Sequence, residues 1–206
     1  MTLNHDKDVS WLAFSETARD IQTRNGSRDM YARVEEKGSW TGVLRDDLKE
    51  FIARQRSFFL GTVNSDLQPY IQHRGGPPGF LKVIDDTTVA FADYSGNKQF
   101  ITQANLQDNS KAFIFLMDYE MQRRLKLWGE ARVIEDDADL MAELMPDRYD
   151  ATPERVVIFD VKLWNLNCTA HIPKRFEAQD VYHALAARDA KIAELEEALL
   201  ELKDGR

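Results

Sequence analysis

Cysteine is almost absent from this chain of 206 residues, which contains only Cys168. One thiol cannot form an internal disulfide or a cysteine-based zinc cluster, so the sequence excludes a disulfide-stapled secreted scaffold and a structural zinc site of that kind. The four histidines are scattered along the chain, with neither an HExxH motif nor paired ligand spacing. No metal site is therefore predicted.

Long apolar runs and an excess of basic residues are missing as well. The longest apolar runs, such as 112–117, have about six residues, far fewer than the roughly 20 that span a bilayer. The first ten residues, MTLNHDKDVS, are polar and unlike a signal peptide, so a cytoplasmic location is expected. With 27 basic against 35 acidic residues, the net charge of -8 argues against a general nucleic-acid surface, although a local basic pocket is compatible with it.

The sequence also lacks several common motifs of catalysis and nucleotide binding. GxSxG, the Walker GxxxxGK[ST] motif and a strand-linked GxGxxG are all absent, so hydrolase, nucleotidase and Rossmann functions lose support. His171 follows Cys168 by three residues, but no third group is identifiable to orient such a pair. We therefore assign no catalytic residue. The composition, 43% hydrophobic and 30% charged, is that of a soluble globular protein.

Three regions with different patterns follow one another. Residues 1–56 lack strand signals and predict a helical lead-in with turns at Asn25-Gly26 and Gly38-Ser39. Residues 57–175 carry the pattern of an antiparallel sheet, and residues 176–206 that of one helix. An amphipathic helix should end the first region before Ser57, because its apolar residues recur at helical spacing: Leu44, Leu48, Phe51 and Ile52.

In the middle region, short runs of β-branched and aromatic residues alternate with turn signals, which predicts a mainly β fold, a barrel or sandwich. Neighbouring strands separated by two to five residues, as at Asp85-Asp86, should pair as hairpins. Helices are expected over 97–107 and 136–144. The expected strands are 58–63, 69–73, 80–84, 88–92, 112–117, 124–134 and 156–163.

The last region has a heptad pattern. Its apolar residues recur at alternating spacings of four and three, with Arg188 as the one polar seam position. Two arrangements are compatible with this pattern: a helix that packs on its own domain and a short self-associating coiled coil. The acidic residues of 176–206 outnumber the basic ones by 8 to 4, so half of the net charge of -8 lies here. The seam residues are Val181, Leu185, Ile192, Leu195, Leu199 and Leu202.

The most informative motif is the segment 72–82, QHRGGPPGFLK, which lies between two expected strands. Its prolines stiffen the backbone and its glycines let the backbone approach a flat ligand closely. His73, Arg74 and Lys82 add positive charge on either side of the loop. The alternative is a hairpin turn with solvated basic flanks.

Two further segments have the composition of a binding site. The segment 93–99, DYSGNKQ, follows a strand and leads into an expected helix, a setting in which free N–H groups and a lysine can bind a phosphate. In the strand 124–134, alternation places Arg124, Lys126 and Trp128 on one face and leucines on the other. Gly129 suits a β-bulge or the close approach of another backbone segment. The alternative for 93–99 is a helix start that binds no ligand. The alternative for the strand is that its charged face is simply exposed to solvent.

Taken together, these segments resemble the FMN-binding split barrel of the pyridoxamine 5'-phosphate oxidase family, in its bacterial branch with the HRGGPPGFLKV motif. The resemblance spans about residues 26–175 and rests on ordered stretches: YIQHRGGPPGFLKV, FADYSGN, NL, MDY, LWGEARV and NC..HIP. It implies a six-stranded antiparallel barrel with flanking helices, and a homodimer with FMN in a cleft between the subunits.

The resemblance also assigns cofactor-binding residues. Arg124 occupies the place of a flavin-contacting glutamine and would reach in from one subunit, while Asp93 would lie near the ring. His73 and Arg74 are active-face residues of this branch, and Asn167 and His171 would close the site. The loop residues that follow the flavin ring or ribityl chain, mostly through backbone groups, are Pro77, Pro78, Gly79 and Phe80. The residues that hold the phosphate are Lys82, Asn97, Lys98 and Gln99.

The activity implied is that of an FMN-dependent oxidoreductase acting on a small molecule, with a nicotinamide as a possible reductant. Pro77 occupies the place of an arginine in the oxidase itself, and the basic C-terminal segment of the oxidase has no counterpart in this chain. Both differences argue against oxidation of pyridoxamine phosphate. Two alternatives stay open: an FMN carrier or sensor that signals through the C-terminal helix, and a related protein that binds a deazaflavin or haem.

Overall fold

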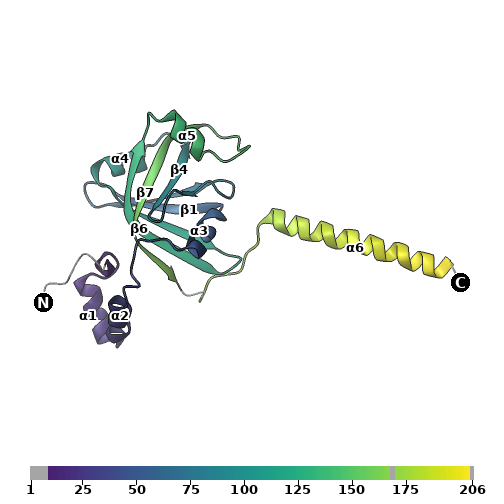
Figure 1. Ribbon diagram of the computed structural model, residues 1–206, viewed down its shortest axis with the longest axis horizontal. Coiled ribbons are helices and arrows are strands. Elements are labelled where there is room, and N and C mark those ends of the chain that lie inside the picture. Colours follow the sequence, from purple (N-terminus) through teal and green to yellow (C-terminus); the bar gives the residue numbers. More distant parts are fainter. Residues whose placement is uncertain (1–8, 168–169, 205–206) are drawn as a thin grey trace. The chain divides into compact units, whose positions relative to one another are not determined.

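Seven antiparallel strands form one continuous sheet, in the order β2-β1-β5-β6-β7-β4-β3, which curves into a split barrel (Figure 1). The computed structural model describes residues 9–167 and 170–204, with the side chains of all of these except Asn167 and Asp204. The strands are β1 (Ser57–Val63), β2 (Pro69–Gly75), β3 (Lys82–Val83), β4 (Thr88–Tyr94), β5 (Lys111–Asp118), β6 (Arg123–Ile134) and β7 (Pro153–Asn167).

All seven expected strands are confirmed, and so are the hairpins β1–β2 and β3–β4. Strands β5 and β6, whose expected separation was longer, also pair as a hairpin. The third strand is shorter than expected, with two residues, because the Phe80 amide closes a turn onto the Pro77 carbonyl at 3.0 Å. Strand β7 is longer than expected, since its pairing with β6 continues to Asn167. The resemblance implied six strands, and the two-residue β3 makes the seventh.

The core lies inside the barrel and is built on strand alternation. Leu125 and Leu127 on β6 are fully buried, whereas Arg124, Lys126 and Trp128 alternate with them on the other face, as predicted. Three aromatic rings from different elements meet in the interior. Phe58 stacks on Phe80 at 5.6 Å between ring centroids and meets Phe91 edge-on at 5.1 Å.

The predicted bulge at Gly129 is confirmed by a shift in the pairing of β6 with β7 between Trp128 and Gly129. A Cβ atom at Gly129 would lie 2.2 Å from the backbone oxygen of Asp160. Only glycine lets the two strands approach so closely here.

The N-terminal region is helical, as expected, with η1 (Ser10–Leu12), α1 (Glu16–Arg24), α2 (Arg28–Glu36) and α3 (Asp46–Ala53). The turns at Gly26 and Gly38 adopt positive φ angles of 73° and 64°. Helix α3 buries Leu48, Phe51 and Ile52. Leu44 is also buried but precedes this helix, because its amide donates a hydrogen bond of 2.6 Å to the Asp86 carbonyl.

The helix expected over 97–107 begins later, as α4 (Ile101–Asp108). This corrects the expectation that Lys98 lies in its first turn. Lys98 and Phe100 have φ angles of 58° and 54°, which are left-handed and incompatible with a right-handed helix. The helix expected over 136–144 is α5 (Ala138–Leu144), and the carboxylate of Asp137 caps it by accepting from the Leu140 amide at 2.9 Å.

The chain divides into two compact units, 1–118 with 123–168, and 119–122 with 169–206. The second unit contains α6 (Ala178–Asp204), a helix of 27 residues that covers the expected heptad pattern. In this unit the Gln122 side chain donates to the Ile172 carbonyl at 2.6 Å, and the Arg175 guanidinium lies 4.6 Å from the Tyr119 ring centroid. Within 9–167 and 170–204, no helix is long and apolar enough to cross a membrane.

Candidate functional site

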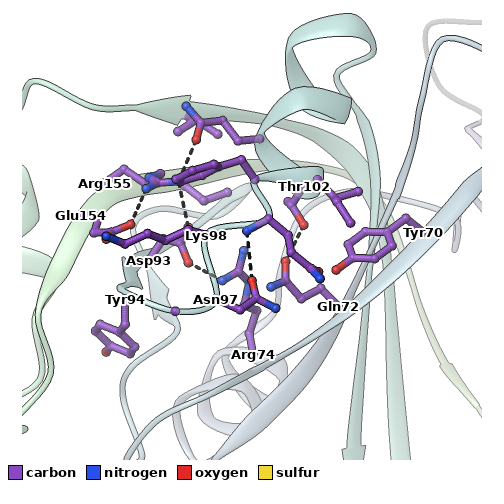
Figure 2. A pocket seen from close by; sticks show the side chains of 17 residues that line it. Tyr70, Gln72, Arg74, Asp93, Tyr94, Asn97, Lys98, Thr102, Glu154 and Arg155 are labelled. Atoms are coloured by element: carbon purple, nitrogen blue, oxygen red, sulfur yellow. Dashed lines mark hydrogen bonds and ion pairs between the residues drawn. The ribbon is translucent and has the colours of Figure 1, made fainter.

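A cleft of about 190 Å³ lies where the edge strand β2 faces β4 and β7, with the 95–100 loop and the start of α4 beside it (Figure 2). We call it the β2–β4 cleft. Tyr70, Gln72 and Arg74 line it from one face of β2, because alternate residues of a strand share a face. The other lining residues are Asp93, Tyr94, Gly96, Asn97, Lys98, Gln99, Phe100, Ile101, Thr102, Gln103, Val133, Glu154, Arg155 and Val157.

An ion pair between Arg74 and Asp93 crosses the cleft and joins β2 to β4, which are not neighbours in the sheet. Asp93 lies opposite Arg155 in the β4–β7 register, and a second guanidinium nitrogen approaches its carboxylate at 4.0 Å. Side-chain exposure is only 16% for Arg74 and 11% for Asp93. A largely buried carboxylate between two guanidiniums therefore closes the split in the barrel.

Arg155 is held in place by several neighbours. Its Nη1 donates to the Gln103 side chain at 2.7 Å, its Nη2 pairs with the Glu154 carboxylate, and its guanidinium lies 5.1 Å from the Phe100 ring centroid. On the other side of the cleft, Thr102 donates to the side-chain oxygen of Gln72 at 2.6 Å. The start of α4 is thus tied to both β2 and β7.

Burial shapes the acid–base properties of the cleft. Burial raises the pKa of the Asp93 carboxyl, and the Arg74 and Arg155 guanidiniums oppose this rise. Burial also lowers the pKa of Arg74, but a guanidinium stays protonated in proteins. We therefore treat the pair as ionised, because two cations flank one carboxylate. Burial raises the pKa of Tyr94 to about 12, so its hydroxyl keeps its proton and can donate.

Two buried polar atoms of the cleft have no hydrogen-bond partner within the described part of the chain: Nε of Arg74 and Nε of Arg155. Buried polar groups in native proteins are almost always paired, so an unpaired one is a candidate contact for a bound ligand or water. Both atoms are hydrogen-bond donors. The cleft is therefore suited to a ligand that brings acceptor oxygens.

The 95–100 loop presents Lys98 at the cleft. Two hydrogen bonds fix its shape: the Ser95 amide donates to the Thr152 carbonyl at 2.8 Å, and the Gln99 amide donates to the Asn97 side chain at 3.2 Å. Left-handed residues within such a turn aim backbone N–H groups at a common point, where they can bind an anion. Asn97 and Lys98 line the cleft together with Arg74 (Figure 2).

The structure gathers some of the expected site residues and separates others. Arg74, Asp93, Asn97, Lys98 and Gln99 line the β2–β4 cleft. Gly79 and Lys82 instead line a second hollow, formed with α3 residues such as Lys49. Phe80 is in the core, where only its backbone is available to a ligand. Pro77 and Pro78 lie in the loop before it.

His73 and Arg124 point elsewhere. His73 is on the face of β2 opposite Arg74 and packs edge-on against Phe59, at 5.6 Å between ring centroids. Arg124 is on the outer face of β6, and its buried Nε has no hydrogen-bond partner among the described residues. The side chain of Asn167 lies outside the described residues. His171 is in an exposed turn of the second unit, with a φ angle of 64°.

Sequence reasoning missed Arg155 and the β2 residues Tyr70 and Gln72. Arg155 carried a usable signal, because a charged residue begins the apolar run VVIF of β7. A charge at such a position must be paired once the strand is buried. Gln72 and Tyr70 precede Arg74 by two and four residues in the same strand, and this spacing places all three on one face.

Comparisons with known proteins agree with this architecture. The family model described as pyridoxamine 5'-phosphate oxidase matches residues 44–169. A search of curated proteins found no match. Among solved structures, HupZ of Group A Streptococcus is 22% identical, with a TM-score of 0.50, and the match covers 60% of this chain and 93% of that one. An FMN-binding protein from Syntrophomonas wolfei is 12% identical, with a TM-score of 0.47 and coverage of 71% and 97%.

The identities to both solved structures are low, so the likeness to HupZ shows a shared fold and no more. The family match is stronger, because residues 44–169 are more than half of the 206 residues. They span all seven strands of the sheet, and they include every residue that lines the β2–β4 cleft. The chain belongs to the pyridoxamine 5'-phosphate oxidase family.

Proposed function

We propose that the protein is an FMN-dependent oxidoreductase acting on a small molecule, with the flavin bound at the interface of a homodimer. The observation that carries this proposal is the donor-rich β2–β4 cleft in a member of this family. Three cations line the cleft, Arg74, Lys98 and Arg155, against two carboxylates, Asp93 and Glu154, so its formal charge is +1 in a chain of net charge -8. Such a local surplus favours a phosphate.

The residues present fit the phosphate end of FMN. Lys98 lies in the 95–100 loop with an exposed side chain that no described residue engages in an ion pair, so its ammonium is available to an anion. The Nε atoms of Arg74 and Arg155, unpartnered among the described residues, add buried donors nearby. We assign Asn97, Lys98 and Gln99 to the phosphate, and Arg74 and Asp93 to the adjoining part of the cofactor.

The cleft is too small to hold the whole cofactor. Pockets for ligands of this size usually have a volume of roughly 300–1,000 Å³, and this cleft has about 190 Å³. A second copy of the chain would supply the missing walls. Arg124 of the partner subunit is our candidate for one of them, because its Nε is buried without a partner among the described residues of the single chain.

The outer face of β1, β2, β5 and β6 supports the dimer. Phe59 and Ile71 on this face are 39% and 68% exposed, and Phe113 packs edge-on against Trp128 at 4.9 Å between ring centroids. An apolar and aromatic patch of this kind marks an association surface. Arg124 shares the face with Trp128, so the same contact that covers the patch would carry Arg124 to the neighbouring subunit.

FMN, when bound, supplies the redox chemistry, and the chain supplies position and charge. The guanidinium of Arg124 would lie beside the ring, where positive charge favours the uptake of electrons. Pro77 and Pro78 would shape the loop along the ribityl chain. No side chain needs to act as a general acid or base.

The proposal is tested by absorbance spectroscopy. The purified protein should carry FMN or, after removal of bound cofactor, should bind added FMN and quench its fluorescence. Addition of NADPH or NADH should then bleach the flavin absorbance. A protein that neither carries FMN nor binds it would overturn the proposed cofactor. A protein that binds FMN but is not reduced would support a carrier or sensor instead of an oxidoreductase.

Substitution of Lys98 by alanine should weaken FMN binding by roughly 1–3 kcal/mol, or about 5- to 150-fold in Kd, because a charge-assisted contact to the phosphate is lost. The melting temperature of the protein without cofactor should hardly change, since Lys98 is exposed. The Lys111→Ala variant is the matched control, because Lys111 is an exposed lysine outside the cleft. Equal FMN affinity of the two variants would refute the phosphate assignment.

A further inference from the structure

Helix α6 presents a narrow apolar seam along its length. Written as heptads, Leu185, Ile192 and Leu199 occupy a positions, while Val181, Leu195 and Leu202 occupy d positions. Their exposed fractions range from 39% at Leu185 to 70% at Leu202. The helix lies outside residues 44–169, which match the family, so its role is not set by the shared barrel.

The residues that border the seam distinguish between two possible partners of α6: a globular domain and a second helix. A helix that packs on a globular domain usually has an apolar stripe wider than a and d alone, because e or g positions are also apolar. In α6, four of the seven flanking e and g positions within 182–203 are charged: Asp189, Glu196 and Lys203 at e and Lys191 at g. Tyr182 at e and Ala184 and Ala198 at g are the uncharged ones. Apart from Leu200, the leucine, isoleucine and valine residues of α6 are confined to a and d, a pattern typical of a two-stranded coiled coil.

The length of α6 also favours a second helix as its partner. With 27 residues and a rise of about 1.5 Å per residue, α6 is roughly 40 Å long, while a small domain is about 30 Å across. The seam runs for most of this length, from Val181 to Leu202. A second helix of equal length covers such a seam from end to end.

The charges around the seam are compatible with a parallel pair. In a parallel dimer, a g residue faces the e residue five positions later on the other helix, which places Lys191 opposite Glu196 twice by symmetry. The polar seam residue Arg188 donates to Asp189 of its own helix, at 3.1 Å, so its charge has a partner beside the seam. Lys191 pairs with Glu194 within one chain at 2.6 Å, an exposed contact that is easily exchanged.

We propose that α6 pairs with α6 of a second copy of this chain as a parallel, in-register coiled coil. This inference does not depend on flavin binding. Three heptads form a short coiled coil, so the pair is expected to be reversible and to strengthen with protein concentration. Each helix region carries 8 acidic against 4 basic residues, so added salt should strengthen the pairing by screening their repulsion.

Disulfide trapping in the full-length chain tests the proposal. Cys168 is first replaced by serine, and Leu185→Cys is then introduced at an a position, where parallel helices bring the two copies of one residue together. A disulfide needs the two Cα atoms within about 7 Å. We expect mild oxidation to convert most of the Leu185→Cys protein to a covalent dimer. The matched control is Ala190→Cys, on the opposite face of the same helix, which should stay largely uncrosslinked.

Two outcomes would overturn the proposal. Equal crosslinking at positions 185 and 190 would show random collision, and no crosslinking at either would show that the seam is covered by something else, such as the chain's own barrel. Circular dichroism of each variant verifies that α6 remains helical. Adding Leu195→Asp to the Leu185→Cys variant should abolish the crosslink, because a charge in the seam disrupts the pair.

Discussion

Replacing Asp93 by alanine should lower the free energy of unfolding by about 3–5 kcal/mol, the usual loss when one member of a buried ion pair is removed. The Arg74 and Arg155 guanidiniums would then face each other in a largely buried cleft without the carboxylate that separates them. The measurement is the midpoint of urea unfolding, followed by a spectroscopic signal of the sheet, with the denaturant slope compared between variants.

The Asp86→Ala variant is the matched control for this experiment. Asp86 also pairs with a cation, Lys49 at 2.6 Å, but its side chain is 70% exposed. An exposed pair contributes at most about 1 kcal/mol. If the two variants lose the same small amount of stability, the Arg74–Asp93 pair does not stabilise the barrel. The double variant Arg74→Met with Asp93→Leu should recover part of the loss, because apolar side chains of similar size can replace a buried pair.

Substitution of Gly129 by alanine should destabilise the protein by about 3 kcal/mol, because the added methyl group has no space. It would lie 2.2 Å from the backbone oxygen of Asp160 and 2.6 Å from a ring carbon of Phe159. Both neighbours belong to β7, and Phe159 is fully buried in the core, so neither can move without disturbing the pairing of β6 with β7. The measurement is again chemical unfolding.

Gly61 provides the matched control within the same sheet. A Cβ atom there would lie 3.5 Å from its nearest neighbour, the Cβ of Phe113, which is ordinary van der Waals contact. Gly61→Ala should change the free energy of unfolding by less than about 1 kcal/mol. A loss for Gly129→Ala no larger than that of Gly61→Ala would show that the bulge can relax.

Much of the barrel was predictable from the sequence because its determinants are local. Alternation of apolar and polar residues located β6, with Leu125 inside and Arg124 outside, and turn residues such as Asp85-Asp86 located the hairpins. Gly129 marked the bulge, because a glycine weakens a strand interior and is typical of places where a strand bulges or another backbone comes close.

The site was less predictable because it depends on contacts between distant segments. Residues 97–100 have a composition compatible with a helix, and only the left-handed conformations of Lys98 and Phe100 show that they form a loop. The pairing of Arg74 with Asp93 spans 19 residues and requires knowledge of which strands face each other across the split. Lys82 and Lys98 both suit a phosphate in sequence, yet they line different hollows.

The split in the barrel has a consequence for how a ligand enters. Among the described residues, β2 pairs with no strand other than β1, and side chains connect it to β4. A side-chain contact is released by a rotamer change, whereas separating two paired strands requires the loss of a whole ladder. The mouth of the cleft can therefore widen by local rearrangement at Arg74 while the sheet stays intact. Amide hydrogens of β2 should accordingly exchange with solvent faster than those of β6, which has a paired strand on each side.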